Sequence, residues 1–230
     1  MSHTPVTDWI FDLDNTLYPG GDVLFGQIVS RITKYISRYL SLHPREALQV
    51  QKQYLAEYGT SLSGMMAVHG MDPAEFLDYV HDIDLTALEP NPRLAKAIKA
   101  LPGRKFVFTN GSRAHARNIT GHLGLKGVFD GLFALEDMDY IPKPKPEAYD
   151  RFNRAFDIDP DRALMVEDMA RNLKLPKAQG MRTLLITSEG NYENEPPDCR
   201  PLSGTDIPEW VDWHTSDLAA WLEDWPRRDD

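Results

Sequence analysis

Three short apolar runs in this chain each lead directly into polar residues. The runs are 9–11, 106–108 and 163–166, and the residues that follow are Asp12-Leu13-Asp14, Thr109-Asn110 and Glu167-Asp168. Apolar runs of this length between helical stretches are typical of strands in a parallel sheet that is buried on both faces. Ligands of such sheets bind beyond the carboxyl ends of the strands. The sequence therefore predicts one shared pocket lined by these polar side chains.

From residue 93 onward, helical and strand patterns alternate along the chain. The expected helices are 93–100, 114–122, 146–156 and 170–179, and the expected strands are 105–108, 132–135, 163–166 and 183–186. Residues 191–208 are polar and rich in turn signals, 210–213 are predicted as an edge strand and 217–225 as a final helix. The alternation predicts an α/β fold with a doubly wound, Rossmann-like parallel sheet.

Between residues 19 and 92 the pattern is helical only. Tyr18-Pro19-Gly20-Gly21 predicts a turn, and apolar residues then recur at helical spacing up to Tyr39. Further helices are expected at 44–58 and 73–80, with a loop at 59–64 between them. Residues 61–69 are either core packing or a segment that reaches over the pocket to contact the substrate. We predict a core domain formed by 1–18 and 93–230, and a helical cap formed by 19–92.

Composition excludes several classes of partner. The formal net charge of −10 over 230 residues opposes binding to nucleic-acid polymers and anionic membranes. No apolar stretch reaches the roughly 20 residues of a membrane span, and residues 1–7 resemble no secretory signal. The single cysteine, Cys199, cannot form an intramolecular disulfide, so we expect a reducing, cytoplasmic location. A small anionic substrate fits if the pocket is locally positive, and the oligomeric state is left open.

The carboxylates in this pattern predict a metal-assisted reaction. Asp12 and Asp14 are two residues apart at the end of a strand, a pairing that suits a nucleophile and an acid/base. Together with Glu167 and Asp168 they would repel one another and raise each other's pKa values. A divalent cation relieves this repulsion, and Mg²⁺ fits best because it prefers carboxylate, water and phosphate oxygens. The cation also screens an anionic substrate from an anionic nucleophile.

A second group of residues is suited to binding a phosphate. Thr109, Asn110 and Gly111 offer a hydroxyl, an amide and backbone N–H groups just before an expected helix. Lys143 supplies a positive charge, whereas Lys145 is expected to be solvated because only one lysine of the pair can point inward. The histidines at positions 69, 81, 115 and 122 lack metal-ligand spacing and are interpreted as surface or helix-cap residues.

Four segments together resemble the motifs of the haloacid dehalogenase superfamily, in order. They are FDLDNTLY at 11–18, FTNGS at 108–112, KPKPEAY at 143–149 and VEDMARNL at 166–173. More narrowly, the opening FDLDNTLYP, the helical insertion after it and the string IPKPKPEAY resemble the bacterial pyrimidine 5′-nucleotidase branch. Glu167 stands where many relatives carry Asp, and Met169 where serine is common.

The resemblance implies a role for each motif residue. Asp12 would attack phosphorus to give an aspartyl-phosphate, and Asp14 would protonate the leaving oxygen and later activate water. Thr109 and Lys143 would hold the phosphoryl oxygens. Mg²⁺ would be bound by the Asp12 carboxylate, the Asp14 backbone carbonyl and Asp168. Glu167 or Asn172 would assist in the outer shell.

Together these observations predict a Mg²⁺-dependent phosphomonoesterase whose favoured substrate is a pyrimidine nucleoside 5′-monophosphate. Alternatives are a phosphatase of sugar phosphates or other small metabolites, and a phosphomutase, which uses the same nucleophile and acid. A dehalogenase has little use for a carboxylate at position 14, since carbon–halogen cleavage needs neither acid nor metal. A receiver-like phosphoacceptor is compact, so the helical insertion speaks against it. An isolated Asp-x-Asp is more often a turn or helix cap than a catalytic pair, but four ordered motifs reverse that balance.

Overall fold

The computed structural model describes residues 4–19, 24–188, 190 and 200–225. Its strands are β1 (Asp8–Phe11), β2 (Arg104–Phe108), β3 (Gly131–Phe133), β4 (Ala163–Glu167), β5 (Arg182–Ile186) and β6 (Trp213–Thr215). Its α-helices are α1 (Gly26–Leu40), α2 (Pro44–Tyr58), α3 (Ser61–His69), α4 (Pro73–Val80), α5 (Pro92–Ala100), α6 (Arg113–His122), α7 (Pro146–Phe156), α8 (Ala170–Ala178) and α9 (Leu218–Glu223). Two 3₁₀ helices, η2 (Leu135–Met138) and η3 (Pro160–Arg162), complete the described elements.

The strands form one parallel sheet in the order β3-β2-β1-β4-β5-β6, which confirms the predicted doubly wound fold. The order reverses at β1, which lies between β2 and β4. Phe11 at the end of β1 is in register with Val107 of β2 and Val166 of β4. The residues that follow these three strands are therefore level with one another at the carboxyl edge.

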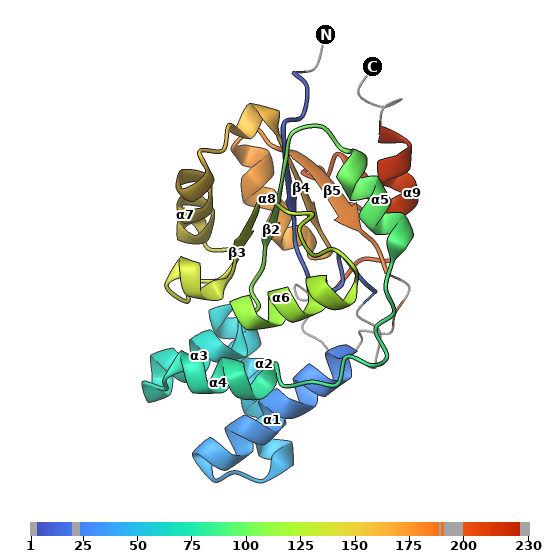
Figure 1. The fold of residues 1–230 in the computed structure, drawn as a ribbon. Helices are drawn as coiled ribbons and strands as arrows, with labels where there is room; N and C mark the ends of the chain where they lie inside the picture. Colours follow the sequence, from blue (N-terminus) through green and yellow to red (C-terminus); the bar gives the residue numbers. More distant parts are fainter. Residues whose placement is uncertain (1–3, 20–23, 189, 191–199, 226–230) are drawn as a thin grey trace.

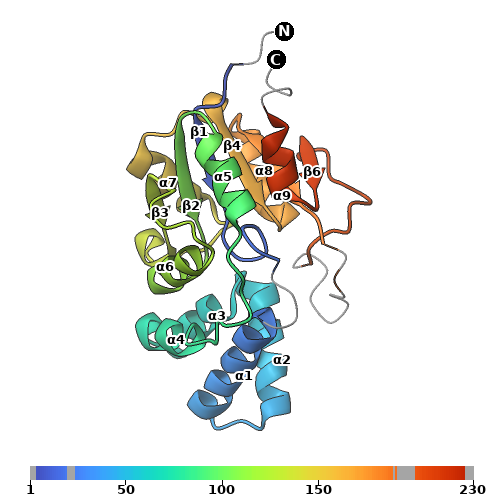
Figure 2. The same ribbon diagram turned by 45° about the vertical axis from the view of Figure 1, so that its right-hand side comes forward.

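The sheet is buried on both faces because alternate strand residues point to opposite sides. Trp9 and Phe11 belong to a core with side chains of α5, α6 and α9, whereas Ile10 belongs to a second core with α7 and α8. Figures 1 and 2 show these helices around the sheet. The strands consequently lack a polar face, which is why they appear in the sequence as continuous apolar runs.

Helices α1 to α4, which we call the helical cap, pack on one another beyond the carboxyl edge of the sheet (Figure 1). The expected loop at 59–64 is wrong in part, because α3 begins at Ser61. The Thr60 hydroxyl caps this helix by accepting from the Ser63 N–H at 3.0 Å. A side chain at Gly64 would place its Cβ 2.3 Å from Cγ of Tyr54, so glycine allows α2 and α3 to pack closely.

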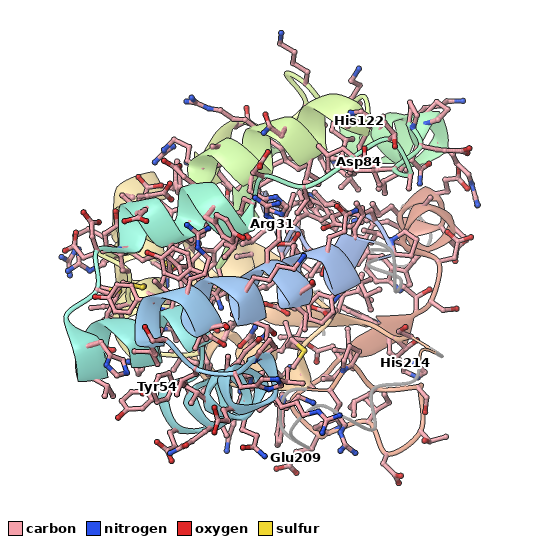
Figure 3. The ribbon with its side chains drawn as sticks, turned by 90° about the horizontal axis from the view of Figure 1, so that it is seen from below. Arg31, Tyr54, Asp84, His122, Glu209 and His214 are labelled. Carbon is pink, nitrogen blue, oxygen red and sulfur yellow. The ribbon has the colours of Figure 1, made fainter. Side chains whose placement is uncertain are left out.

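The chain that returns from the cap to the core runs beside α1. Gln27 of α1 makes two hydrogen bonds with the Asp84 backbone, donating to its carbonyl at 3.0 Å and accepting from its N–H at 2.9 Å. Arg31 donates to the Tyr79 carbonyl at 2.7 Å and forms an ion pair with Asp82 at 2.9 Å. Figure 3 shows Arg31 and Asp84 from the cap side. These contacts fix the returning segment relative to the cap.

The C-terminal part of the sheet differs slightly from expectation. The last strand is Trp213–Thr215 rather than 210–213, because Trp210 lies in a turn and pairing with β5 begins only at Trp213. The Asp212 carboxylate accepts from the Thr183 N–H of β5 just before this pairing, at 2.9 Å. Cys199 and most of the turn-rich segment before residue 200 lie outside the described residues. No helix in the described part of the chain is both long and apolar enough to span a bilayer.

Two glycines with the same backbone conformation should respond differently to alanine. Gly103 and Gly124 both have φ +75°, but a Cβ at Gly103 would lie 2.1 Å from the Thr7 carbonyl oxygen, and one at Gly124 would meet nothing within 4 Å. We expect Gly124→Ala to lower the free energy of unfolding by about 1–2 kcal/mol, the usual penalty of a left-handed residue. Gly103→Ala should cost roughly 2 kcal/mol more, since backbone must shift. Urea unfolding measures both, and equal losses would contradict the clash.

Candidate active site

A cavity of about 280 Å³ lies between the carboxyl edge of the sheet and the helical cap. The predicted site residues that line it are Asp12, Asp14, Thr109, Asn110, Gly111, Glu167, Asp168 and Asn172. They follow β1, β2 and β4, the three strands whose ends are level at the switch in strand order. The structure thus brings the predicted residues together in one pocket, with Lys143 buried directly behind Asp12.

The Lys143 ammonium group joins the ends of three strands. Its Nζ donates to the Asp12 carboxylate at 2.7 Å, to the Glu167 carboxylate at 2.8 Å and to the Phe108 carbonyl at 2.7 Å. The side chain is only 1% exposed, so its three protons all go to protein acceptors. Burial opposes the charge, but the two carboxylates raise the pKa of Lys143 and keep it a cation.

Asn110 holds Lys143 in place. The Asn110 side-chain oxygen accepts from the Lys143 N–H at 2.8 Å, and its amide nitrogen donates to the Lys143 carbonyl at 3.1 Å. The amide that the sequence suggested for a substrate oxygen is thus paired with backbone. Thr109 is buried and accepts from the Gly111 N–H at 2.9 Å, which shapes the loop after β2. Lys145 is exposed, as expected.

Full ionisation of the acidic cluster, formed by Asp12, Glu167 and Asp168, is unfavourable. Burial raises the pKa of Asp12 to about 7 and Glu167 adds to this, although Lys143 acts in the opposite direction. Burial, followed by the charges of Glu167 and Asp12, raises the pKa of Asp168 well above its usual range. Both shifts have the cause expected for crowded carboxylates, in which the charged form is disfavoured. The cluster therefore gains stability from a proton or a cation.

The donor set fits a divalent cation. Asp12, Glu167 and Asp168 each offer a carboxylate oxygen within 4.8 Å of the others. The Glu167 oxygens already accept from Lys143, from the Met169 N–H at 2.8 Å and from the Asn172 amide at 2.7 Å. The buried Oδ1 of Asn172 has no hydrogen-bond partner, and a water molecule on a hydrated cation could donate to it. This arrangement favours Asp12 and Asp168 as ligands, with Glu167 and Asn172 around them.

Asp14 lies in a different environment from Asp12. The chain turns after it because Asn15 adopts φ +61°, and the Asn15 amide then donates to Asp168 at 3.2 Å. Asp14 Oδ1 accepts from the Tyr18 hydroxyl at 2.5 Å and is 2.7 Å from Nε2 of His115. Burial would raise the pKa of Asp14, but His115 and the hydroxyl of Tyr18 outweigh it and lower the value to about 2.

The interpretation as a surface or helix-cap residue is wrong for His115, whereas His81 is partly buried and does end a helix, as the C-cap of α4. His115 is 1% exposed, and Asp14 raises its pKa although burial opposes this. The His81 ring stacks on it with centroids 4.3 Å apart, and His81 Nδ1 lies 3.0 Å from the Ser112 hydroxyl. Burial and the charge of His115 lower the pKa of His81 to about 3. His115 lies in the first turn of α6, the helix after β2, and this turn faces the carboxyl edge of the sheet. Its position just after the second motif is the sequence signal that could have identified it as a site residue.

The cap side of the cavity is mostly apolar. Helices α1, α2 and α4, with Phe25 just before α1, contribute Phe25, Ile28, Val29, Ile32, Leu55, Phe76, Leu77 and Val80. Gln51 of α2, together with Thr60 and Ser61 at the start of α3, adds polar groups. Of the segment 61–69, for which contact with the substrate was an alternative, only Ser61 and Leu62 line the cavity, whereas Met65 is in the core.

The comparisons with known proteins agree with this geometry. Residues 10–180 match the haloacid dehalogenase-like hydrolase family. The chain belongs to this family. The match includes the strand ends that carry Asp12, Thr109 and Glu167, as well as the cap, so it covers every residue that lines the cavity except Pro201.

Two curated proteins are similar in sequence. Phosphate metabolism protein 8 of Saccharomyces cerevisiae is 25% identical over 209 residues, which cover 81% of this chain and 64% of that protein. Enolase-phosphatase E1 of Methylococcus capsulatus is 24% identical over 166 residues, which cover 71% of this chain and 63% of that protein. The chain thus spans slightly less than two thirds of the length of these relatives.

Solved structures share the fold across nearly the full chain. CbbY from Rhodobacter sphaeroides in complex with phosphate has a TM-score of 0.62 and 20% identity, covering 93% of this chain and 95% of that one. A HAD phosphatase from Thermococcus onnurineus has a TM-score of 0.60 and 17% identity, covering 97% of both chains. L-2-haloacid dehalogenase from Xanthobacter autotrophicus has a TM-score of 0.59 and 16% identity, covering 96% and 99%. At these identities the likeness concerns the fold alone.

Removal of the Lys143 charge should destabilise the metal-free protein in a pH-dependent way. Lys143→Met leaves the Asp12 and Glu167 carboxylates buried without their cation, which we expect to cost about 3–5 kcal/mol at pH 7.5. Without the lysine the pKa of Asp12 rises further, so the folded state takes up protons and the loss should shrink as the pH falls to 5.5. Urea unfolding at both pH values measures this. The exposed control Lys145→Met should stay within about 0.5 kcal/mol of the parent, and a pH-independent loss would contradict the charge argument.

Proposed function

We propose that this protein is a Mg²⁺-dependent phosphomonoesterase that acts through an aspartyl-phosphate on Asp12 and favours pyrimidine nucleoside 5′-monophosphates. One observation carries the proposal. The Asp12 carboxylate, fixed by Lys143 at 2.7 Å, lines the same cavity as the separately held carboxylate of Asp14. A nucleophile and an acid/base in distinct environments are what phosphate-ester hydrolysis through a covalent intermediate requires.

The reaction divides into two steps in this pocket. An Asp12 oxygen forms a bond to phosphorus while the bond from phosphorus to the leaving oxygen breaks, and Asp14 gives that oxygen a proton. Asp14 takes up this proton when the anionic phosphate lies beside it, because a nearby negative charge raises the low pKa of this carboxyl group. In the second step Asp14 takes a proton from water, which attacks phosphorus and frees Asp12 with inorganic phosphate. Lys143 and the loop at Thr109 would stabilise the charge on the transferring phosphoryl group. The apolar cap would exclude competing water during the first step.

Asp12, Asp168 and the Asp14 backbone carbonyl are the proposed ligands of Mg²⁺. When bound, the ion would neutralise the acidic cluster and orient the anionic phosphate toward Asp12. The raised pKa values of Asp12 and Asp168 support this assignment, because these groups gain most from a nearby cation. The relatives named for phosphate metabolism and for enolase-phosphatase activity also support phosphate-ester chemistry.

Dehalogenation and receiver-like phosphorylation give no function to Asp14 or to the cap cavity, respectively. A dehalogenase of this fold has no evident need for the hydrogen-bonded carboxylate at position 14, since a halide leaves without a proton. A receiver-like phosphoacceptor lacks a function for the apolar cap cavity. A phosphomutase differs only in the acceptor of the phosphoryl group, and products formed from a sugar phosphate distinguish it from a hydrolase.

The cap side of the cavity supports a leaving group with an apolar, planar body and a polar edge. The apolar wall suits ring packing, and the volume of about 280 Å³ is close to the roughly 300 Å³ at the lower end for small-molecule sites. Gln51 interrupts this wall and is 6% exposed. One end of its amide pairs with the Thr33 hydroxyl at 2.5 Å. Its other end, the amide nitrogen, has no partner among the described residues and can donate to a carbonyl oxygen of a pyrimidine.

A phosphate-release screen tests the activity directly. We expect release from pyrimidine nucleoside 5′-monophosphates, more slowly from sugar phosphates and phosphoglycolate, and its loss on addition of EDTA with recovery by Mg²⁺. Asp12→Asn should reduce turnover by at least about 10⁴-fold, because the amide is a poor nucleophile. Folded, Mg²⁺-supplied protein that releases no phosphate from any monoester would refute the proposal, as would near-normal turnover by Asp12→Asn.

Gln51 should contribute to recognition of the base. Gln51→Leu removes the polar edge but keeps the packing, so kcat/KM for uridine 5′-monophosphate should fall by about 10-fold, the effect of one hydrogen bond. Ribose 5-phosphate, which lacks a base, should be hydrolysed at an unchanged rate. The exposed control on the same helix is Gln53→Leu, for which neither value should change. A parallel loss on both substrates in Gln51→Leu would show that the residue acts on stability or on the phosphate instead.

A further inference from the structure

We propose that Tyr18 and His115 form a clamp on Asp14 Oδ1 that reserves Oδ2 as the oxygen that carries the proton to the leaving group. We call these two side chains the Asp14 clamp. Both are positioning residues, since they act through Asp14. The inference rests on the proposed function, because it specifies how the acid/base of that reaction is held.

The two oxygens of the Asp14 carboxylate have different surroundings. Oδ1 accepts from the Tyr18 hydroxyl at 2.5 Å and lies 2.7 Å from His115 Nε2. Oδ2 has no hydrogen-bond partner among the described residues and faces the loop after β2, where a Cβ built on Gly111 would lie 3.5 Å from it. Asp14 also retains 28% of its side-chain exposure, on the cavity side. One oxygen is thus fully engaged and the other is open to a ligand.

This asymmetry decides where a proton can be carried. A proton on Oδ1 would meet the donors of Tyr18 and His115, whereas a proton on Oδ2 meets none. The two donors also prevent the carboxyl group from rotating, because rotation would exchange the oxygens and break both hydrogen bonds. In the first step the O–H bond at Oδ2 breaks as the leaving oxygen gains its proton. In the second step Oδ2 regains a proton from the attacking water.

The clamp is itself held by the core and by the end of the cap. Tyr18 is 4% exposed and lies one turn after Asp14, so its hydroxyl reaches back to the carboxylate. His115 is fixed on one side by its ring stacking with His81, whose Nδ1 contacts the Ser112 hydroxyl. His81 directly follows α4, at the start of the segment that returns to the core. The imidazole therefore has little freedom to turn away from Asp14.

Leaving groups of different basicity separate this role from a structural one. 4-Nitrophenyl phosphate releases a weakly basic phenoxide that needs little protonation, whereas phenyl phosphate, of similar shape, needs an acid. Three variants alter the clamp: His115→Leu removes the donor, His115→Gln retains an N–H donor, and Tyr18→Phe removes only the hydroxyl. Single-turnover kinetics with Mg²⁺ measure the first step for each substrate.

We expect His115→Leu to slow the step about 100-fold for phenyl phosphate and no more than about 10-fold for 4-nitrophenyl phosphate, with Tyr18→Phe showing the same selectivity to a smaller degree. His115→Gln should recover most of the loss. The exposed residues His122 and Tyr39 provide matched controls, and His122→Gln and Tyr39→Phe should match the parent. Equal losses on both substrates, or no recovery in His115→Gln, would overturn the clamp. Tyr18→Phe retains the ring and keeps the test independent of how His115→Leu folds.

A measurement without turnover distinguishes failure of this inference from failure of the proposed function. In ¹⁵N-labelled protein, Nε2 of His115 should appear as a protonated donor whose shift changes in Tyr18→Phe and in Asp14→Asn, while His122 is unaffected. If the parent hydrolyses no phosphomonoester, the proposed function fails, yet this signal still reports the clamp. A His115 signal that does not respond to either substitution would overturn the clamp even in an active enzyme.

Discussion

The pocket depends on the ion pairs that the buried Lys143 ammonium group forms with the Asp12 and Glu167 carboxylates. The ammonium group lies between these carboxylates at 2.7 and 2.8 Å and also binds the Phe108 carbonyl, so one cation joins the ends of β1, β2 and β4. Crowded carboxylates at a sheet edge would otherwise repel one another in a poorly solvated space. The lysine removes part of that repulsion, and the acidic residues that remain form the candidate metal site.

The environment gives two nearby aspartates opposite properties. Asp12 lies in the acidic cluster, where burial raises its pKa to about 7, whereas His115 and Tyr18 lower the pKa of Asp14 to about 2. In the proposed reaction Asp12 would depend on a cation to act as a nucleophile, whereas the Asp14 carboxylate is held by the Tyr18 hydroxyl and the His115 ring. Chemically identical side chains two residues apart thus have opposite pKa shifts because different partners surround them.

Much of the fold could be predicted from the chain, and the errors have physical causes. The parallel sheet and its helices follow from apolar runs and their alternation, since both faces must be covered. The loop predicted at 59–64 is partly helix because Thr60 caps it and Gly64 lets it pack on Tyr54, a tertiary contact. The pairing of the Asn110 amide with the Lys143 backbone was not predicted, because it depends on where two distant loops meet.

The sequence by itself determined which strands end in chemical groups and in what order, because strand period and motif spacing are local properties of the chain. It therefore placed Asp12, Thr109, Lys143 and Asp168 at one edge of the sheet. Only the tertiary structure decided which side chains touch. His115 contacts Asp14, which lies about a hundred positions earlier in the chain. Gln51 lines the cavity together with residues from other helices. No local sequence pattern encodes such long-range contacts.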